Sequence, residues 1–198
     1  MIKKKTARFS VVVLAVASLA ATVTVLGMGP VGSGGSPKST FSLEKAQTFA
    51  NFPVYYAGDS VRDIPLVAVL RRNDSATYVS FIYGECDARG DAGCAPPGEV
   101  QVWPACRRNP SLYAGLRSSI SPVPEQTTVR GVPAASFEDG HRLEIQTGVS
   151  TVVIFGDSPQ FVLELANALR GTNNDVHPGA ALPPPHPGAV DGSLPCDQ

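Results

Sequence analysis

The middle and the last third of the chain contain short runs in which hydrophobic and polar residues alternate. Such alternation is typical of a strand that buries one face. Asp139-Gly140 has the signature of a type I′ turn, because both central residues of that turn need a positive φ. It joins two of the runs, and residues 72–75 join two others, so the pattern predicts antiparallel hairpins. The predicted strands cover residues 64–71, 77–84, 99–103, 127–130, 134–138, 142–147 and 150–155.

Helical periodicity occurs on both sides of this strand-rich region. Ser42 suits the N-cap of a short helix that ends before Pro53. A second helix is predicted over 159–170, since Ser158 suits its N-cap and Pro159 suits its first helical position. Its apolar residues recur at helical spacing and give it one face to bury. The sequence therefore predicts an α+β fold, in which an antiparallel sheet of about six to seven strands carries a C-terminal helix packed on one face.

A longer hydrophobic run, residues 10–29, precedes this region and contains no charged residue. From Val11 to Met28 it would rise about 27 Å as a helix, close to the roughly 30 Å of a bilayer's hydrocarbon core. Basic residues 3–5 and Arg8 lie directly before it. This pattern predicts a single transmembrane helix, with the N-terminus in the cytoplasm and the rest of the chain outside. The alternative is a signal peptide whose cleavage would leave a secreted protein.

These patterns divide the chain into five parts. Residues 1–9 would form a cytoplasmic stub, 10–29 the anchor, 30–40 a flexible linker and 41–171 an extracytoplasmic domain. The remaining residues, 172–198, are rich in Pro and Gly and poor in large apolar side chains. Because such a segment buries too little surface to offset its ordering entropy, we expect it to be disordered or extended.

Charge and cysteine content narrow the class of protein. The formal net charge of −1 and the sequence pI of about 6.3 give no electrostatic basis for binding nucleic acid. Outside the cytoplasm the four cysteines would be oxidised, and they allow three pairings. Cys86 and Cys94 flank a Gly-rich loop and are expected to pair. Cys106 would then pair with Cys196, which stabilises the fold by about 4 kcal/mol in the chain-entropy model, unless Cys196 is free or pairs with another chain.

Few residues in the chain could carry chemistry. The sequence has no nucleophile elbow, phosphate loop or zinc motif, and it predicts no catalytic residue, no metal ligand and no cofactor. His141 lies beside a hairpin turn with no nucleophile or orienting acid placed near it, so we expect an exposed turn residue. Acidic residues around Cys86 lack the spacing of a calcium loop.

Trp103, Arg107 and Arg108 form the best candidate for a binding surface. They comprise the single tryptophan of the chain and two adjacent arginines. These residue types are enriched at interaction hot spots. The alternative is that Trp103 fills the core while both arginines are solvated.

Several local features together resemble a domain of unknown function. They are Phe52-Pro53 after the first helix, the strand around 129–134, the turn at Gly140 and the helix after Ser158. That family occurs on the outer side of single-pass membrane proteins of Gram-positive bacteria, some of them anti-sigma-factor-like. The resemblance implies an extracytoplasmic accessory or sensory domain and brings no catalytic residues with it. The cytoplasmic stub of about nine residues is too short to bind a sigma factor.

The sequence therefore predicts a non-enzymatic, membrane-anchored domain that binds or senses a protein or a cell-envelope component outside the cell. One alternative is a carrier or sensor of an apolar ligand, held in a pocket between sheet and helix and lined by Phe161 and Leu165. A hydrolase with an unrecognised site is a third hypothesis.

Overall fold

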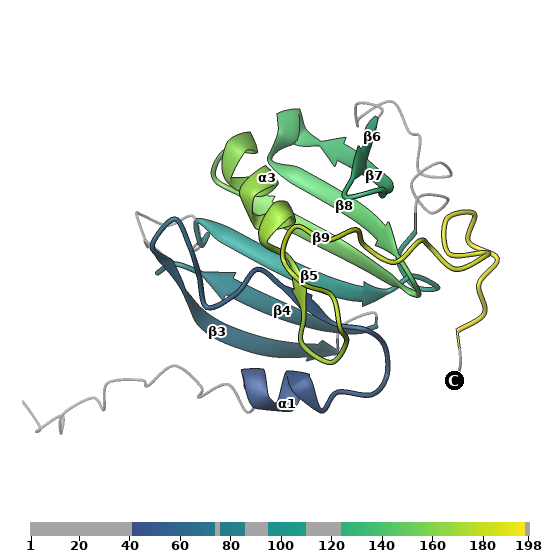
Figure 1. Ribbon diagram of the computed structural model, residues 1–198, viewed down its shortest axis with the longest axis horizontal. Helices are drawn as coiled ribbons and strands as arrows, with labels where there is room; N and C mark the ends of the chain where they lie inside the picture. Colours follow the sequence, from purple (N-terminus) through teal and green to yellow (C-terminus); the bar gives the residue numbers. More distant parts are fainter. Residues whose placement is uncertain (1–40, 74–75, 86–94, 110–123, 197–198) are drawn as a thin grey trace, which may run out of the picture. The chain divides into compact units, whose positions relative to one another are not determined.

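The computed structural model describes residues 41–73, 76–85, 95–109 and 124–196. In this part of the chain, eight strands form one antiparallel sheet with the order β2-β3-β4-β5-β9-β8-β7-β6 (Figure 1). Two further strands, β1 and β10, pair in a small second sheet. The strands are β1 (Tyr55–Tyr56), β2 (Ser60–Val61), β3 (Ile64–Asn73), β4 (Thr77–Tyr83), β5 (Gly98–Pro104), β6 (Glu125–Val129), β7 (Val132–Phe137), β8 (Arg142–Thr147), β9 (Ser150–Gly156) and β10 (Arg170–Gly171).

Three short helical elements accompany the sheet in the described residues. They are α1 (Leu43–Gln47), the 3-10 turn η1 (Glu138–Gly140) and α3 (Pro159–Ala168). α3 begins at Ser158, whose Oγ accepts a hydrogen bond from the Phe161 N–H at 3.3 Å. α1 begins in the same way at Ser42. The prediction of an antiparallel sheet followed by a C-terminal helix is confirmed.

The sheet has one strand more than the sequence predicted. The additional strand is β2, which at two residues is too short to show an alternating pattern. The chain turns from β2 into β3 through Arg62 and Asp63, whose φ angles are 49° and 62°. Neither is a glycine, so the sequence gives no turn signal there. The predicted two-residue turn at Asp139-Gly140 is wrong, because η1 and His141 form a longer connection from β7 to β8.

One face of the main sheet forms the hydrophobic core beneath α3. The register places Val79 beside Val102, Phe81 beside Val100, and Val100 beside Ile154. Side chains from α3 and from the segment before β2 cover this face. The largest fully buried residues of the core include Tyr55, Phe81, Tyr83, Ile145, Ile154, Phe161, Leu165 and Leu169.

The helix approaches the sheet closely at two glycines. A Cβ on Gly98 would lie 2.7 Å from Cε1 of Phe161 and 3.0 Å from Cδ1 of Leu165, and one on Gly156 would lie 2.8 Å from Cγ2 of Val162. The absence of side chains on the two strands thus allows the helix to pack directly on the backbone. Phe161 and Leu165 therefore fill the space that the hypothesis of a ligand carrier left for an apolar ligand.

The C-terminal segment is the largest departure from the sequence-based picture, since the prediction of a disordered 172–198 is wrong for residues 172–196. These residues follow a defined path past the ends of β8 and β9 (Figure 1). Leu182 is buried, and Thr147 Oγ1 donates a hydrogen bond to the Pro183 carbonyl at 2.8 Å. The His186 N–H donates to the Gly148 carbonyl at 2.7 Å. The domain thus extends beyond the predicted boundary at residue 171.

Arg130 is the main attachment point of this segment. Its guanidinium donates three hydrogen bonds to backbone carbonyls, those of Leu169 at 2.6 Å, His177 at 2.7 Å and Ala180 at 2.6 Å. Its own carbonyl accepts a hydrogen bond from the Leu182 N–H at 3.0 Å. Burial lowers the pKa of Arg130 below its ordinary value. Arg130 lies in the two-residue turn between β6 and β7, with a φ of 49°. This turn of the sheet therefore positions the guanidinium beside the carbonyls that it binds.

The predicted anchor from Val11 to Met28 and the flexible linker 30–40 lie outside the described residues. In the described part of the chain, every helix is too short or too polar to cross a bilayer. The anchor therefore stays a prediction.

Replacing Arg130 by Asn tests the three hydrogen bonds of the guanidinium without backbone strain, because Asn tolerates a positive φ. The R130N variant loses three charge-assisted hydrogen bonds, and we expect a loss of about 2–4 kcal/mol in the free energy of unfolding. Urea denaturation measures this loss. Hydrogen exchange should also quicken at the Leu182 amide.

The matched control for this variant is R62N. Arg62 has the same φ of 49° in the equivalent position of the β2–β3 turn, but its guanidinium forms an exposed ion pair with Glu164. Exposed ion pairs contribute little to stability, so R62N should cost much less than R130N. Equal losses would mean that the three carbonyl contacts of Arg130 are not what holds the C-terminal segment.

The close approach of α3 to Gly98 gives a second prediction. G98A forces a methyl group against the Phe161 ring, and overpacking of this kind costs about 1–3 kcal/mol. Combining it with F161L should recover part of the loss, because leucine leaves room for the methyl group. Thermal and urea unfolding of the two variants measure the effect, and a fully stable G98A protein would contradict the packing described for α3.

Candidate functional site

The structure separates the three residues that the sequence grouped as a binding surface. Trp103 and Arg108 are engaged with neighbours on the sheet, whereas Arg107 is exposed and lines a pocket. The separation arises in the turn after β5, where the N–H groups of Arg107 and Arg108 both donate to the Pro104 carbonyl, at 2.9 and 3.1 Å. Adjacent residues in such a turn project in different directions.

Trp103 is half-buried in a stack of flat side chains. Its ring lies 3.8 Å from the ring of Tyr78 with an interplanar angle of 13°, and its Nε1 donates a hydrogen bond to Gln101 Oε1 at 3.0 Å. The guanidinium of Arg108 lies 5.2 Å from the centre of the Trp103 ring. Stacking and cation–π contacts of this kind stabilise a fold directly. Trp103 therefore has a structural role.

Arg108 also neutralises a buried carboxylate. Its Nη2 donates to Glu144 Oε1 at 2.6 Å, and the Glu144 side chain is only 2% exposed. Arg142 lies on the other side of the same carboxylate, with Nε 3.6 Å from Oε1. A buried carboxylate needs such partners, because an unpaired charge in the interior is costly. Arg108 is thus committed to Glu144 and Trp103.

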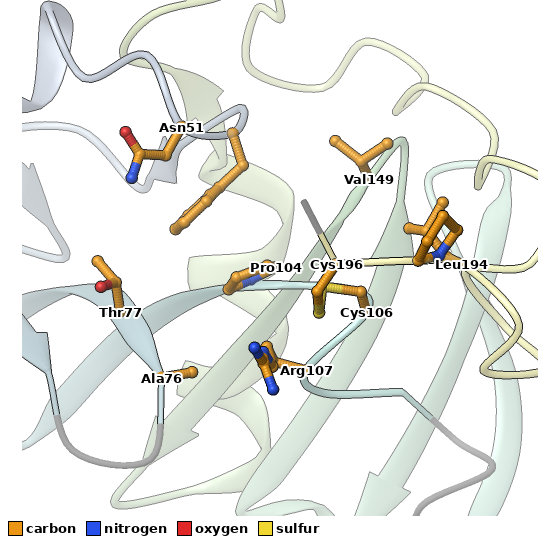
Figure 2. Close-up of a pocket in the computed structure, with 11 residues that line it drawn as sticks. Asn51, Ala76, Thr77, Pro104, Cys106, Arg107, Val149, Leu194 and Cys196 are labelled. Carbon is orange, nitrogen blue, oxygen red and sulfur yellow. A yellow bond between two sulfur atoms is a disulfide. The ribbon is translucent and has the colours of Figure 1, made fainter. Parts of the chain in front are cut away.

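The pocket that contains Arg107 has a volume of about 400 Å³ and forms where five segments meet (Figure 2). These are the chain after α1, the start of β4, the end of β5 with its turn, the β8–β9 turn, and the end of the C-terminal segment. Its lining residues are Asn51, Phe52, Ala76, Thr77, Pro104, Cys106, Arg107, Val149, Leu194, Pro195 and Cys196.

A disulfide bond between Cys106 and Cys196 forms one wall of this pocket, as Figure 2 shows. It joins residues 90 positions apart and is the second of the two pairings that the sequence predicted. The turn that carries Cys106 is held in place by the Ala105 N–H, which donates to the Val149 carbonyl at 2.9 Å, and by Asn109 Nδ2, which donates to the Ala105 carbonyl at 3.1 Å. The predicted partners Cys86 and Cys94 lie outside the described residues.

Among the lining residues that the structure describes, Arg107 supplies the only charge. Its guanidinium forms no hydrogen bond or ion pair within the part of the chain that the structure describes. The other polar side chains of the lining are the Asn51 amide and the Thr77 hydroxyl, which donates to Asn73 Oδ1 at 2.9 Å. The rest of the described lining consists of apolar side chains, the disulfide and backbone groups, and the surface that faces the pocket is as much polar as apolar. The pocket therefore combines one cation with a mixed polar and apolar surface.

The other groups considered for chemistry lie elsewhere in the fold. His141 is exposed, and its Nδ1 lies 3.0 Å from the Gly156 carbonyl oxygen. Within the described ranges, no group of three or more His, Cys, Asp or Glu side chains is placed to hold a metal ion. The described lining residues of the pocket include no histidine and no carboxylate.

Most of the pocket could not be found from the sequence. Of its lining, Arg107 and the two cysteines were singled out there as site residues and Phe52 only as part of the family resemblance, whereas Asn51 and Val149 carry no motif. The usable signal was the pairing of Cys106 with Cys196, since a bond between them brings the end of the chain to the end of β5.

Removing the disulfide should open this side of the pocket. In C106S/C196S we expect a loss of about 3–5 kcal/mol in the free energy of unfolding, because the bond closes a long loop. Amides of Gly192 and Leu194, which donate to the Gly188 carbonyl at 3.0 Å, should exchange faster with solvent. Mass spectrometry of the non-reduced wild-type protein provides the control, and a peptide pair that links Cys106 to a cysteine other than Cys196 would contradict the structure.

Comparison of the chain with protein-family models, with curated proteins and with solved structures finds no match in any of the three.

Proposed function

We propose that this protein is a non-enzymatic, membrane-anchored extracytoplasmic binding domain that contacts a protein or a cell-envelope component through the pocket around Arg107. The observation that carries the proposal is the exposed Arg107 guanidinium, which has no partner among the described residues and lies in a hollow with a disulfide wall. A cation held in this way is free to bind an anionic group from another molecule.

Two features support a location outside the cytoplasm. Structural disulfides persist in oxidising compartments, and the Cys106–Cys196 bond helps to build the pocket. The charge-free run from Val11 to Met28, with basic residues before it, provides the membrane anchor in this proposal.

Binding is better supported than catalysis by the chemistry of the lining. One guanidinium, one amide and one hydroxyl can recognise a ligand. General acid–base catalysis would need a side chain with a pKa near the working pH, and the described lining supplies none. The alternative of an apolar-ligand carrier has less support, because Phe161 and Leu165 pack onto Gly98.

Site-specific photo-cross-linking in native membranes tests this proposal. A photoreactive residue is placed in the full-length chain at Asn51 or Thr77 in the lining, and at Val67 or Leu163 as controls. The controls are 47% and 53% exposed and lie outside the lining. We expect a discrete adduct at the lining positions only, and a several-fold loss of that adduct when R107E is added, since the reversed charge repels an anionic group.

Two outcomes would contradict the proposal. Adducts of equal yield at all four positions would show that the pocket is not the contact site. An absence of adducts at the lining positions would remove the evidence for a binding partner.

A further inference from the structure

We infer that β6 is a self-association surface, at which two copies of this chain pair their β6 strands antiparallel around a two-fold axis at Thr127. This inference goes beyond the proposed function, because β6 contributes no residue to the described lining of the Arg107 pocket. β6 is the end strand of the main sheet, with β7 on one side and no strand of the described residues on the other (Figure 1).

The outer edge of β6 is open to another chain. Four of its five side chains, those of residues 125–128, are exposed. The strand pairs with β7 in a continuous register and contains no Pro, Gly or Lys. Edge strands of natural proteins commonly carry a bulge, a proline or a lysine, because these features block pairing with another chain. β6 has none of the three, and its residues 127–129 are β-branched, which suits a strand.

The register between β6 and β7 determines which backbone groups of β6 point outward. Pro133 has no N–H, so it cannot exchange two hydrogen bonds with Thr128, its partner on β6. Hydrogen-bonded and non-hydrogen-bonded pairs alternate along an antiparallel ladder, so Gln126 also belongs to a non-hydrogen-bonded pair. The N–H and C=O groups of Gln126 and Thr128 therefore point away from β7. In the described chain they take part in no backbone hydrogen bond outside the sheet.

One antiparallel register of two β6 strands pairs all of these outward groups. It places each Gln126 opposite Thr128 of the second copy, and the two such pairs form four backbone hydrogen bonds. A slide of two residues in one direction would place Thr128 opposite Pro124, which has no N–H to donate. A slide in the other direction would place Gln126 opposite Arg130, which lies in the β6–β7 turn. The edge is therefore self-complementary in a single register.

The side chains that face each other in this register are compatible. Thr127 lies opposite Thr127 of the second copy, and Glu125 lies opposite Val129. Cross-strand Thr pairs are favourable, whereas like charges directly opposite are destabilising. The two Glu125 residues would be about 14 Å apart along the strands, at about 3.4 Å per residue. The single charge of β6 thus does not oppose itself, and the two-fold contact closes at two copies. This self-complementarity favours a second copy as the occupant of the edge.

Disulfide cross-linking of the full-length chain in phosphatidylcholine vesicles tests the inference. T127C places two thiols across the two-fold axis, where the Cβ atoms of opposite residues lie about 4.5–5.5 Å apart, close to disulfide geometry. We expect mild oxidation to give a covalent dimer on a non-reducing gel. E125C is the matched control on the same strand and face. Its two thiols would lie about 14 Å apart, so it should give several-fold less dimer.

Variants of the outward edge assign the pairing to β6. Q126P in the T127C chain removes an N–H that points away from β7, so the dimer yield should fall several-fold while urea unfolding changes little. T127K and T127E each place like charges across the axis without changing the backbone. In energy-transfer measurements between labelled copies, each should associate several-fold less than the unmodified chain, and an equimolar mixture of the two should recover the signal.

Three results would overturn the inference. The first is a T127C dimer yield no higher than that of E125C, which a contact through another surface or a strand from a different protein on this edge would produce. The second is an undiminished dimer yield in folded Q126P/T127C. The third is a mixture of T127K and T127E that associates no better than T127K alone. If Q126P unfolds the domain, the charge-reversal mixture decides, because it leaves the backbone hydrogen bonds in place.

Discussion

The backbone hydrogen bonds that hold the C-terminal segment on the domain are the constraint on which the candidate site depends. Arg130 binds two carbonyls of this segment, those of His177 and Ala180, and the Gly148 N–H donates to the carbonyls of Pro183 and Pro184 at 3.3 and 3.2 Å. These contacts direct the chain past the β8–β9 turn, and the Cys106–Cys196 bond then fixes its end. Three lining residues of the pocket, Leu194 to Cys196, take their places only on this path.

The C-terminal segment is ordered for a physical reason that cannot be inferred from its composition. Proline has no backbone N–H, so a proline-rich stretch offers carbonyls that need donors from elsewhere. The domain provides them through Arg130, the Thr147 hydroxyl and the Gly148 N–H. Proline also has less conformational entropy to lose on folding. A segment without a core of its own is thus ordered by donors that lie far away in the sequence, which a compositional argument cannot detect.

The parts of the fold that the sequence predicted are those specified locally. The seven longer strands follow from alternation, and α3 follows from Ser158 and Pro159, because a strand face and a helix cap are each defined by neighbouring residues. The parts that were missed depend on backbone conformation without a glycine signal. Arg62, Asp63 and Glu138 all have positive φ, and they set the turns that create β2 and η1.

In the candidate site, the sequence likewise does not predict how two adjacent side chains are placed. Arg107 and Arg108 are identical in type and neighbours in sequence, yet Arg108 is paired with the buried Glu144 whereas Arg107 has no partner in the described chain. Only the turn at Pro104 decides which of them faces the pocket. Since the chain as a whole is nearly neutral, with a formal net charge of −1, long-range attraction contributes little to recognition. Any selectivity of the pocket therefore has to arise at short range, from the exposed Arg107 guanidinium and from the Asn51 amide and Thr77 hydroxyl of the described lining.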